Sequence, residues 1–231
     1  MKSLKNRQHL FFDLDDTLWD FEKNSSFVLS ELFLEFELKK KIKTDFHNFY
    51  AAYKNINQHL WTQYRKKQID KEFLRSSRFH LAMKFFDHDD LDESLLLNEQ
   101  YLRRAPNGKV LKDGCLETLE YLAKKHTLHI ITNGFKEIQH IKIDGCGLKD
   151  YFSNIIISEE HLLTKPDEKI FRLAETLAGT DKEACVMIGD NFDCDVKGAN
   201  DAGWASIYYS EIEHRYTGHS IENLAELRQI F

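Results

Sequence analysis

The sequence predicts an α/β fold in which a doubly wound parallel sheet carries an α-helical segment inserted after its first strand. Three observations lead to this prediction. Five short apolar runs have the length of buried strands, and continuous runs of this kind are typical of parallel sheets covered on both faces. Helical patterns separate the last four runs, as crossover helices do. One long segment, 20–105, breaks the alternation because it contains helical patterns alone.

The predicted strands consist mainly of β-branched and other apolar residues. In chain order they are 9–14, 128–132, 154–158, 184–189 and 206–209. The crossover helices are predicted at 114–125, 136–145, 167–179 and 191–203, and the first of them leads into the second strand. Pro166 precedes the start of the third of these helices, as proline often does at a helix start.

The inserted segment is predicted to form a helical cap domain over 20–105, beside a catalytic core made of 1–19 and 106–231. Its aromatic residues recur at helical spacings, which indicates that most of them pack inside the cap and that one or two face the substrate crevice. A cap joined by two linkers is expected to open and close over that crevice.

Capping residues set the expected helix boundaries within the cap. Asn24 or Ser25 is expected to cap its first helix, and Asp70 its third. The acidic stretch 87–93 is expected to be a solvated loop and cap. It lacks the glycine and the terminal glutamate of an EF-hand loop, which argues against calcium binding.

The composition is that of a globular protein and excludes some classes of function. Of 231 residues, 42% are hydrophobic, and 38 acidic residues against 32 basic ones give a net charge of −6. The chain therefore lacks the basic surface of a nucleic-acid-binding protein. No apolar run approaches the ~20 residues of a membrane span, and residues 1–8 lack the apolar stretch of a secretory signal. We expect a soluble, cytoplasmic protein with no nucleic-acid or membrane partner.

The cysteines and histidines fall outside any recognisable metal or redox motif. The four cysteines form neither a C-x-x-C pair nor a zinc spacing, so we expect reduced thiols in or near the core. The eleven histidines are expected to be surface or packing residues.

Polar residues follow four of the predicted strands at the points where those strands end. In open α/β sheets the carboxyl ends of the strands border the crevice in which ligands bind, so these groups are expected to converge on one site. They are Asp13, Asp15, Asp16 and Thr17 after the first strand, Thr132, Asn133 and Gly134 after the second, Lys165 beyond the third, and Gly189, Asp190, Asn191, Asp193 and Asp195 after the fourth.

These groups suit a magnesium-dependent transfer of a phosphoryl group. Carboxylates this close together repel one another, and a cation would offset the repulsion. Asp13 and Asp190 offer hard oxygens to Mg²⁺, which takes one or two carboxylates together with phosphate and water. Asp13 would then attack phosphorus in line to give an aspartyl-phosphate. Asp15 would protonate the leaving oxygen and later activate water.

The other groups would bind the phosphoryl oxygens. Thr132, the amide of Asn133 and Lys165 would hold those oxygens and stabilise the transition state electrostatically. Lys165 would also favour the ionised form of Asp13.

The four stretches together resemble the four motifs of the haloacid dehalogenase (HAD) superfamily. DLDDT is similar to D-x-D-x-T, and ITNG to the motif of a hydrophobic strand ending in Thr or Ser. TKPDEKIF is similar to the lysine motif of the cap-bearing subfamily, and GDNFDCDVKGANDAG to G-D-x-x-x-x-D-x-x-G-A-x-x-A-G. Order and spacing agree over the whole chain, so the resemblance implies a Rossmann-like HAD core with a helical cap.

The resemblance implies roles for single residues. Asp13 would be the nucleophile and Asp15 the acid/base. Mg²⁺ would be held by the Asp13 side chain, the Asp15 main-chain carbonyl and Asp190. Asp195 would orient the ion or Lys165, with direct ligation of the metal as the alternative.

The remaining motif residues are expected to act less directly. Thr17 would brace the first loop. Asn191 stands where many family members have serine, and it would contact a metal-bound water. Asp16 is expected to face solvent or to cap a turn, and Asp193 is expected to be a solvated helix position. Gly189 is expected to serve backbone conformation and close approach.

Asp15 also indicates the class of reaction. A dehalogenase displaces halide and needs no general acid at that place, so Asp15 favours phosphoryl transfer, and the lack of membrane spans argues against an ion pump. A non-catalytic phosphate-binding scaffold would be expected to lack Asp13, Asp15 or Lys165, and all three are present. The expected enzyme is a Mg²⁺-dependent phosphatase of a small-molecule phosphate ester, acting as a monomer or a homodimer.

The stretch DDTLWDFEKNS suggests the substrate. It is similar to the first motif of the noncanonical pyrimidine nucleotidase (YjjG-like) group, which continues into TLWDF. The resemblance implies a pyrimidine nucleoside 5′-monophosphatase. Asp16 departs from the histidine of some members of that group. The alternatives are a phosphatase of a small sugar or organic-acid phosphate, such as phosphoglycolate, and a phosphomutase.

Overall fold

The computed structural model describes residues 4, 7–212 and 215–231. The chain forms two compact units, one made of Met1–Phe21 and Lys109–Phe231 and the other of Glu22–Gly108. We call them the core unit and the helical unit. The expectation that residues 1–8 carry no secretory signal falls partly on 1–3 and 5–6, which lie outside the described residues.

The core unit is built on one six-stranded sheet with the order β3-β2-β1-β4-β5-β6, in which every strand pair is parallel. The predicted α/β doubly wound fold is therefore confirmed. The chain moves outward from β1 in both directions, so the order reverses between β1 and β4, and ligands bind at such a switch point. The strands are β1 His9–Phe12, β2 Thr127–Thr132, β3 Phe152–Ile157, β4 Cys185–Gly189, β5 Ala205–Tyr209 and β6 Ser220–Ile221.

The register brings the carboxyl ends of the three central strands together. Phe12 of β1 lies beside Ile130 of β2 and Ile188 of β4. The next residue, Asp13, continues this pairing because its main-chain N–H donates to the carbonyl of Ile188 at 2.9 Å. The first acidic motif therefore leaves the sheet beside the glycine and aspartate that end β4.

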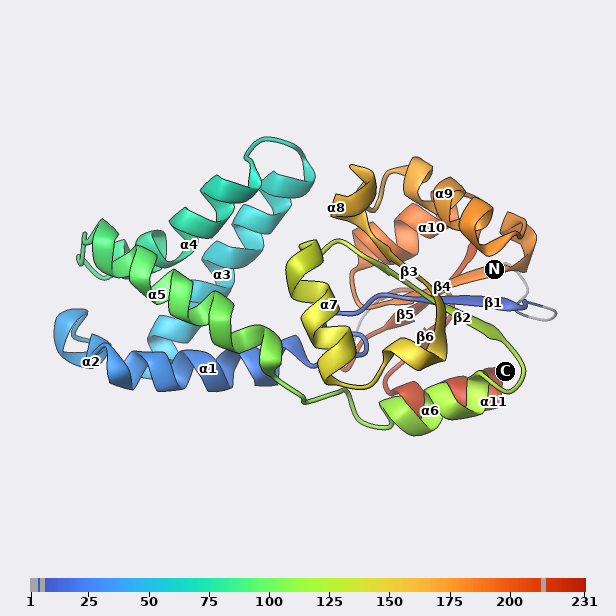
Figure 1. Cartoon of the computed structure of the whole chain (residues 1–231), viewed down its shortest axis with the longest axis horizontal. Coiled ribbons are helices and arrows are strands. Elements are labelled where there is room, and N and C mark those ends of the chain that lie inside the picture. The colour runs from blue at the N-terminus through green and yellow to red at the C-terminus, as the bar shows by residue number, and fades with distance from the viewer. Residues whose placement is uncertain (1–3, 5–6, 213–214) are drawn as a thin grey trace. The chain divides into compact units, whose positions relative to one another are not determined.

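Helices cover both faces of the sheet and bury two separate cores (Figure 1). Leu10 and Phe12 of β1 pack with α6 and α7 on one face, whereas Phe11 packs with α9 and α10 on the other. This alternation is what a buried strand requires, and it explains the continuous apolar run of β1. The helices are α6 Cys115–Leu122, α7 Lys136–Gly145, α9 Glu168–Ala178, α10 Gly198–Asp201 and the C-terminal α11 Leu227–Ile230.

The structure of the core differs from the prediction in two places. The expected single helix at 191–203 is a π-helical turn, η4 Phe192–Lys197, followed by α10. Strand β6 was not predicted, because two residues are too short to leave a hydrophobic pattern. The remaining short elements are η1 Ala105–Asn107, η2 Lys149–Tyr151, α8 Ser158–His161, η3 Lys182–Ala184 and η5 Leu224–Glu226.

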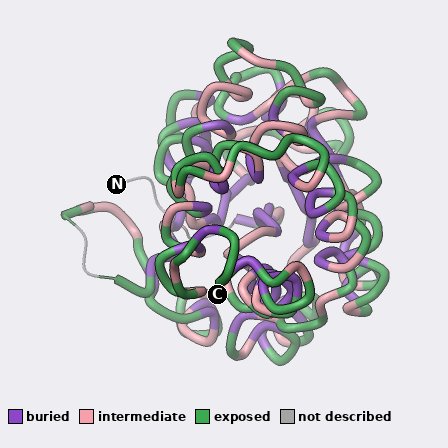
Figure 2. Tube along the Cα trace, turned by 90° about the vertical axis from the view of Figure 1, so that its left-hand side faces the viewer, coloured by how far each residue is buried: buried purple, intermediate pink, exposed green. Residues whose placement is uncertain are grey.

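The helical unit packs its helices around an aromatic core that includes Phe33, Phe49, Tyr53, Phe79 and Tyr101. Buried and exposed stretches alternate along the tube in Figure 2, as expected for amphipathic helices. Its helices are α1 Phe21–Glu35, α2 Leu38–Lys41, α3 Phe46–Arg65, α4 Lys71–Lys84 and α5 Leu91–Arg104.

The predicted caps of these helices are partly right. Asp70 caps α4 by accepting a hydrogen bond from Phe73 N, and Asp90, in the acidic stretch, caps α5 in the same way. The expectation that Asn24 or Ser25 begins the first helix is wrong, because α1 already starts at Phe21. Ser25 instead lies buried within α1, and its hydroxyl is 2.8 Å from that of Tyr101.

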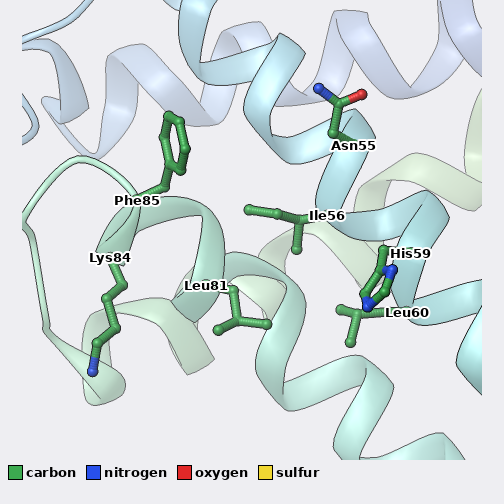
Figure 3. A pocket seen from close by; sticks show the side chains of 7 residues that line it. All are labelled: Asn55, Ile56, His59, Leu60, Leu81, Lys84 and Phe85. Carbon is green, nitrogen blue, oxygen red and sulfur yellow. The ribbon is translucent and has the colours of Figure 1, made fainter.

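The helical unit also carries an apolar groove between α3 and α4, with a volume of about 420 Å³ (Figure 3). No carboxylate lines it, and none of its lining residues belongs to a predicted motif. The groove therefore offers none of the residues on which the chemistry expected of the core depends. Its lining residues are Asn55, Ile56, His59, Leu60, Leu81, Lys84 and Phe85.

Two linkers connect the units, and they run side by side where they leave the core. Trp19 and Leu111 form an antiparallel bridge. The N–H of Lys112 donates to the carbonyl of Leu18 at 2.9 Å, and the N–H of Asp20 donates to that of Val110 at 3.0 Å. The two ends of the inserted segment are therefore paired within the core unit.

The described part of the chain contains no helix that is both long and apolar enough to cross a membrane. All four cysteines, Cys115, Cys146, Cys185 and Cys194, are free thiols. Burial raises the pKa of Cys115 and that of Cys185 to about 12, so both are protonated at neutral pH.

Candidate active site

Lys165 and Asp13 form the centre of the predicted constellation. Asp13 follows β1 directly, and Lys165 stands in the loop between α8 and α9. The Lys165 ammonium donates to Asp13 Oδ1 at 2.6 Å and to Asp195 Oδ1 at 2.6 Å. Only 1% of Lys165 is exposed. Burial alone would lower the pKa of Lys165, but Asp13 and Asp195 outweigh it and raise the pKa above its usual value.

Asp195 contacts Lys165 directly, and its expected role in orienting that lysine stays a prediction. Its Oδ1 accepts from Lys165, and its Oδ2 accepts from the N–H of Asn191 at 3.0 Å. Gly189 makes this approach possible, because a Cβ at that position would lie 2.3 Å from Asp195 Oδ2. Asn191 itself caps η4 by accepting from Cys194 N at 3.0 Å. The expected contact of Asn191 with a metal-bound water stays a prediction.

Asp190 and Thr17 join the ends of β4 and β1. The Thr17 hydroxyl donates to Asp190 Oδ1 at 2.9 Å and accepts from the N–H of Asp190 at 3.1 Å. Thr17 is fully buried. The threonine that was expected to brace the first loop therefore lies in a position that fixes both the side chain and the backbone of Asp190.

Three carboxylates crowd together at this switch point of the sheet. Asp13, Asp190 and Asp195 each offer an oxygen, and these oxygens all lie within 4.8 Å of one another. Burial raises the pKa of Asp13 to about 7, although Lys165 counteracts it. Burial, with repulsion from Asp13 and Asp195, also raises the pKa of Asp190 well above its usual value.

This donor set fits a divalent cation. One ammonium faces three carboxylates, so the charges of the described residues do not balance here without protons or a cation. Carboxylate oxygens are the ligands that Mg²⁺ prefers. We therefore regard Asp13 and Asp190 as the carboxylates that would hold the ion, since Asp195 already has Lys165 and Asn191 as partners.

Thr132, at the end of β2, is oriented by two donors. Its Oγ1 accepts from Gln139 Nε2 at 2.7 Å and from the N–H of Gly134 at 3.3 Å. A hydroxyl oxygen has two acceptor sites and one proton. Because both acceptor sites are filled, the Thr132 proton is free to be donated to an anion.

The Asn133 side chain has a structural task that the sequence did not reveal. Its Nδ2 donates to the carbonyl of Lys165, while its Oδ1 accepts from the N–H of Lys165 and from Ser158 Oγ. The two bonds to Lys165, both at 2.9 Å, fasten the lysine loop to the end of β2, and the bond from Ser158, at 2.6 Å, joins the start of α8 to the same side chain. The side chain is thus occupied, and the predicted binding of an anion by the main-chain amide of Asn133 stays a prediction.

Asp15 has two partners that the sequence analysis missed. Lys142 Nζ lies 2.5 Å from its Oδ1, and Gln139 Nε2 donates to its Oδ2 at 3.0 Å. Both partners come from α7, and both are buried. The available signal was that Gln139 and Lys142 stand three positions apart, which places both on one face of the helix. The apolar pattern was misleading, since Ile141 is 42% exposed whereas Lys142 is 4% exposed.

Asp16 and Asp193 lie at the edge of the constellation. Asp193 is exposed, as expected. Asp16 has a positive φ of 59° and is only partly exposed, and its Oδ1 lies 4.0 Å from the ammonium of Lys112. Lys112 is a second buried lysine that the sequence analysis did not single out, and it also contacts Glu211 at 3.2 Å.

Comparison with known proteins places this constellation in a family. A sequence model of the haloacid dehalogenase-like hydrolases matches residues 8–203. The chain is 32% identical over 203 residues to the pyrimidine 5′-nucleotidase PynA of Streptococcus pneumoniae, covering 87% of this chain and 83% of that protein. It is 29% identical over 227 residues to the pyrimidine 5′-nucleotidase YjjG of Escherichia coli, covering 94% and 96%.

The fold is shared with a solved structure of the same family. The HAD-hydrolase YfnB of Bacillus subtilis, crystallised with magnesium, has a TM-score of 0.89 and 27% identity, covering 98% of this chain and 99% of that one. The likeness extends over both units, and the matched sequence includes all four motifs. This chain therefore belongs to the haloacid dehalogenase-like hydrolase family.

Proposed function

We propose that the protein is a Mg²⁺-dependent phosphatase that hydrolyses pyrimidine nucleoside 5′-monophosphates through an aspartyl-phosphate on Asp13. The observation that carries the chemistry is the buried ammonium of Lys165, shared at 2.6 Å between Asp13 and Asp195 at the switch point of the sheet. The substrate class rests on the likeness to PynA and YjjG over most of the chain.

The metal would be held by the side chains of Asp13 and Asp190 and by the main-chain carbonyl of Asp15. When bound, Mg²⁺ supplies positive charge that neutralises the phosphoryl oxygens and keeps the carboxylates ionised. The buried Thr17 supports this assignment, because it fixes Asp190 through two hydrogen bonds. Direct ligation by Asp195 is the less favoured alternative, given its two other partners.

The first half-reaction transfers the phosphoryl group to Asp13. A carboxylate oxygen of Asp13 attacks phosphorus as the ester P–O bond breaks, and Asp15 gives its proton to the leaving oxygen. Lys165 favours the ionised, nucleophilic form of Asp13 and restricts its rotamer. The Thr132 hydroxyl, the main-chain amide of Asn133 and Lys165 donate to the phosphoryl oxygens, which gather charge in the transition state.

The second half-reaction releases phosphate. Water attacks phosphorus and passes a proton to the carboxylate of Asp15, and the bond between phosphorus and Asp13 breaks. Asp13 and the proton on Asp15 are thereby restored, so the cycle balances without a further reactant. The reaction needs only the phosphate ester, water and the metal.

The decisive experiment measures phosphate release from a panel of nucleoside 5′-monophosphates and small sugar phosphates, with Mg²⁺ and with EDTA. We expect EDTA-sensitive turnover of UMP, dUMP or dTMP in preference to purine nucleotides and sugar phosphates. Preference for a sugar or glycolate phosphate would keep the catalytic assignments and overturn the substrate class. Turnover that EDTA does not reduce would overturn the metal dependence.

A further inference from the structure

We propose that Gln139 and Lys142 of α7 are positioning residues that hold the carboxylate of Asp15 for proton transfer. This inference rests on the proposed function, because it gives Asp15 the role of acid and base. It adds two residues that lie outside the four motifs, more than 120 positions after Asp15 in the chain.

Two side chains donate to different oxygens of the Asp15 carboxylate. Lys142 donates to one oxygen of Asp15 at 2.5 Å, and Gln139 donates to the other at 3.0 Å. Two donors on different oxygens fix the plane of a carboxylate as well as its rotamer. Proton transfer requires hydrogen-bond reach of the ester oxygen, so a fixed carboxylate is better placed to act than a mobile one.

Gln139 couples Asp15 to the phosphate-binding hydroxyl. The same Nε2 that donates to Asp15 donates to Thr132 Oγ1 at 2.7 Å, so both amide protons are used. Gly134 gives the side chain its space, because a Cβ there would lie 2.3 Å from Gln139 Cδ. One fully buried amide thus sets the distance between the acid/base and a group that would bind the phosphoryl oxygens.

Lys142 is itself held by the stretch that follows the first motif. Its ammonium lies 4.2 Å from the ring centre of Trp19 and 5.7 Å from that of Phe21. A buried ammonium over an aromatic face is stabilised by cation–π attraction. The TLWDF stretch therefore supplies two aromatic faces for the lysine that contacts Asp15, which gives this part of the sequence a physical role beyond its likeness to nucleotidases.

Lys142 and Gln139 contact Asp15 in both half-reactions, in which Asp15 first loses a proton and then regains one. When Asp15 has given its proton to the leaving oxygen, Lys142 and Gln139 hold the carboxylate that remains. That carboxylate is the form that must accept a proton from water in the second step. The two donors therefore keep Asp15 in place between the half-reactions, while the P–O bond to Asp13 forms and breaks.

Leaving-group dependence tests this role. A nucleoside alkoxide needs a proton as it departs, whereas p-nitrophenolate leaves without one. We expect Lys142→Met to lower kcat/KM for an alkyl phosphate about ten-fold or more and that for p-nitrophenyl phosphate by less than about three-fold, since general acids contribute about 10²–10⁴-fold. Gln139→Leu should act in the same direction, and Lys142→Arg should restore most of the lost rate.

Matched controls separate positioning from damage to the fold. Asp15→Asn should show the same selective loss with a larger amplitude, and the exposed Lys136 of the same helix, changed to Met, should leave both esters unaffected. The inference would be overturned if both Lys142→Met and Gln139→Leu left the ratio of alkyl to aryl kcat/KM unchanged. It would also be overturned if both variants hydrolysed the alkyl phosphate faster than wild type. If one variant fails to fold, the other decides.

Failure of the proposed function remains distinguishable from failure of this inference. The substrate panel on the wild-type enzyme decides whether nucleotides are hydrolysed. The ratio of alkyl to aryl rates decides the role of α7, and it is measured with whichever alkyl phosphate the wild-type enzyme hydrolyses best.

Discussion

Lys165 is the residue on which the local charge balance depends. It is almost fully buried and is the only described ammonium bonded to both Asp13 and Asp195. A buried charge of this kind is costly to leave without hydrogen-bond acceptors, and here Asp195 is a second charged partner beside Asp13. The nucleophile can therefore be changed with little risk to the fold only if a polar isostere replaces it, because Lys165 still needs an acceptor there.

Asp13→Asn meets that condition. We expect kcat for the best substrate to fall by about three orders of magnitude or more, because an amide cannot form the covalent intermediate. The amide oxygen can still accept from Lys165, so the thermal midpoint should stay within a few degrees of wild type. Mass spectrometry should first verify that the preparation carries asparagine at position 13. If that preparation still turned over substrate at a near-native rate, another residue would be the nucleophile.

Gly134 is the residue at which space matters most in the loop after β2. In Gly134→Ala the new methyl group would meet the Gln139 side chain at 2.3 Å, so that side chain, α7 or the loop must shift. We expect a loss of about 1–3 kcal/mol in unfolding free energy, the usual cost of overpacking, together with reduced hydrolysis. Urea unfolding measures the first. The control is Gly145→Ala, because no atom beyond its chain neighbours and the backbone of its own helix lies within 4 Å of a Cβ at that position.

At the scale of elements, the sheet contains a pair of neighbouring histidines, of which His129 is buried and His9 is partly buried. Asn154 Nδ2 lies 3.0 Å from His129 Nδ1, and His129 Nε2 lies 3.1 Å from His9 Nδ1. An amide NH₂ can only donate, so His129 accepts at Nδ1 and donates from Nε2 in its neutral form. Burial lowers the pKa of His129 to about 4.

This pair predicts a loss of stability in mild acid. The unfolded His129 has its ordinary pKa near 6.5, so between about pH 6.5 and 4 the unfolded chain binds a proton that the folded chain does not. The contribution of His129 to stability is therefore full above pH 6.5 and is lost as pH drops through this window, at up to about 1.4 kcal/mol per pH unit. Asp13, whose pKa is raised to about 7, contributes a slope of the opposite sign, so the effect of His129 is the difference between the slopes of wild type and of its variant. Urea unfolding at several pH values measures the slope. His129→Leu should have a shallower slope, and equal slopes would contradict the assignment.

Helices α4 and α5 are joined by a buried polar contact. Arg78 donates to Asn98 Oδ1 from Nε at 3.0 Å and from Nη2 at 2.8 Å, and its guanidinium lies 4.8 Å from the ring centre of Tyr101. Asn98→Ala removes the acceptor of both bonds. We expect it to lower the unfolding free energy of the helical unit by about 1.5–3 kcal/mol, the range for bonds to charged groups.

The exposed Asn55 of α3 offers a matched control for that change. Asn55→Ala makes the same substitution without removing a buried acceptor, and it should alter the midpoint of chemical unfolding very little. If the two variants unfold at the same denaturant concentration, the contact between Arg78 and Asn98 contributes no net stability.

The elements that could be predicted from the sequence are those with a local signal. The central strands are continuous apolar runs, and Asp70 is a capping residue in a capping position. The start of α1 was missed because Asn24 and Ser25 have the composition of caps, although both are buried within the helix. Propensity is a weak local preference that tertiary packing overrides.

The residues of the site also differ in whether the sequence could predict them. Residues at strand ends could be predicted to converge, because parallel topology brings those ends together. Gln139 and Lys142 could not, since their meeting with Asp15 depends on how α7 packs on the sheet. The spacing of Gln139 and Lys142 places them on one face of α7, but the isoleucines of that helix suggest a different buried face.

At the scale of the whole molecule, the core unit has its own sheet and two cores, and the helical unit has a third. Because Trp19 and Leu111 are bridged, a short turn can join the two linkers. We expect a chain in which a Gly-Ser turn replaces residues 22–108 to unfold cooperatively and to retain the circular dichroism of an α/β protein. Non-cooperative melting would show that the core depends on the insert.

The bridged linkers also have a consequence for how such a protein can diversify. Closing a flexible loop costs only about 0.6 kcal/mol more for each doubling of its length, and here the ends of the loop are already held by the core. Insertions, deletions or wholesale exchange between those ends would leave the strand register untouched. A lineage could therefore acquire new substrates by replacing one contiguous stretch of its gene while inheriting its reaction chemistry unchanged.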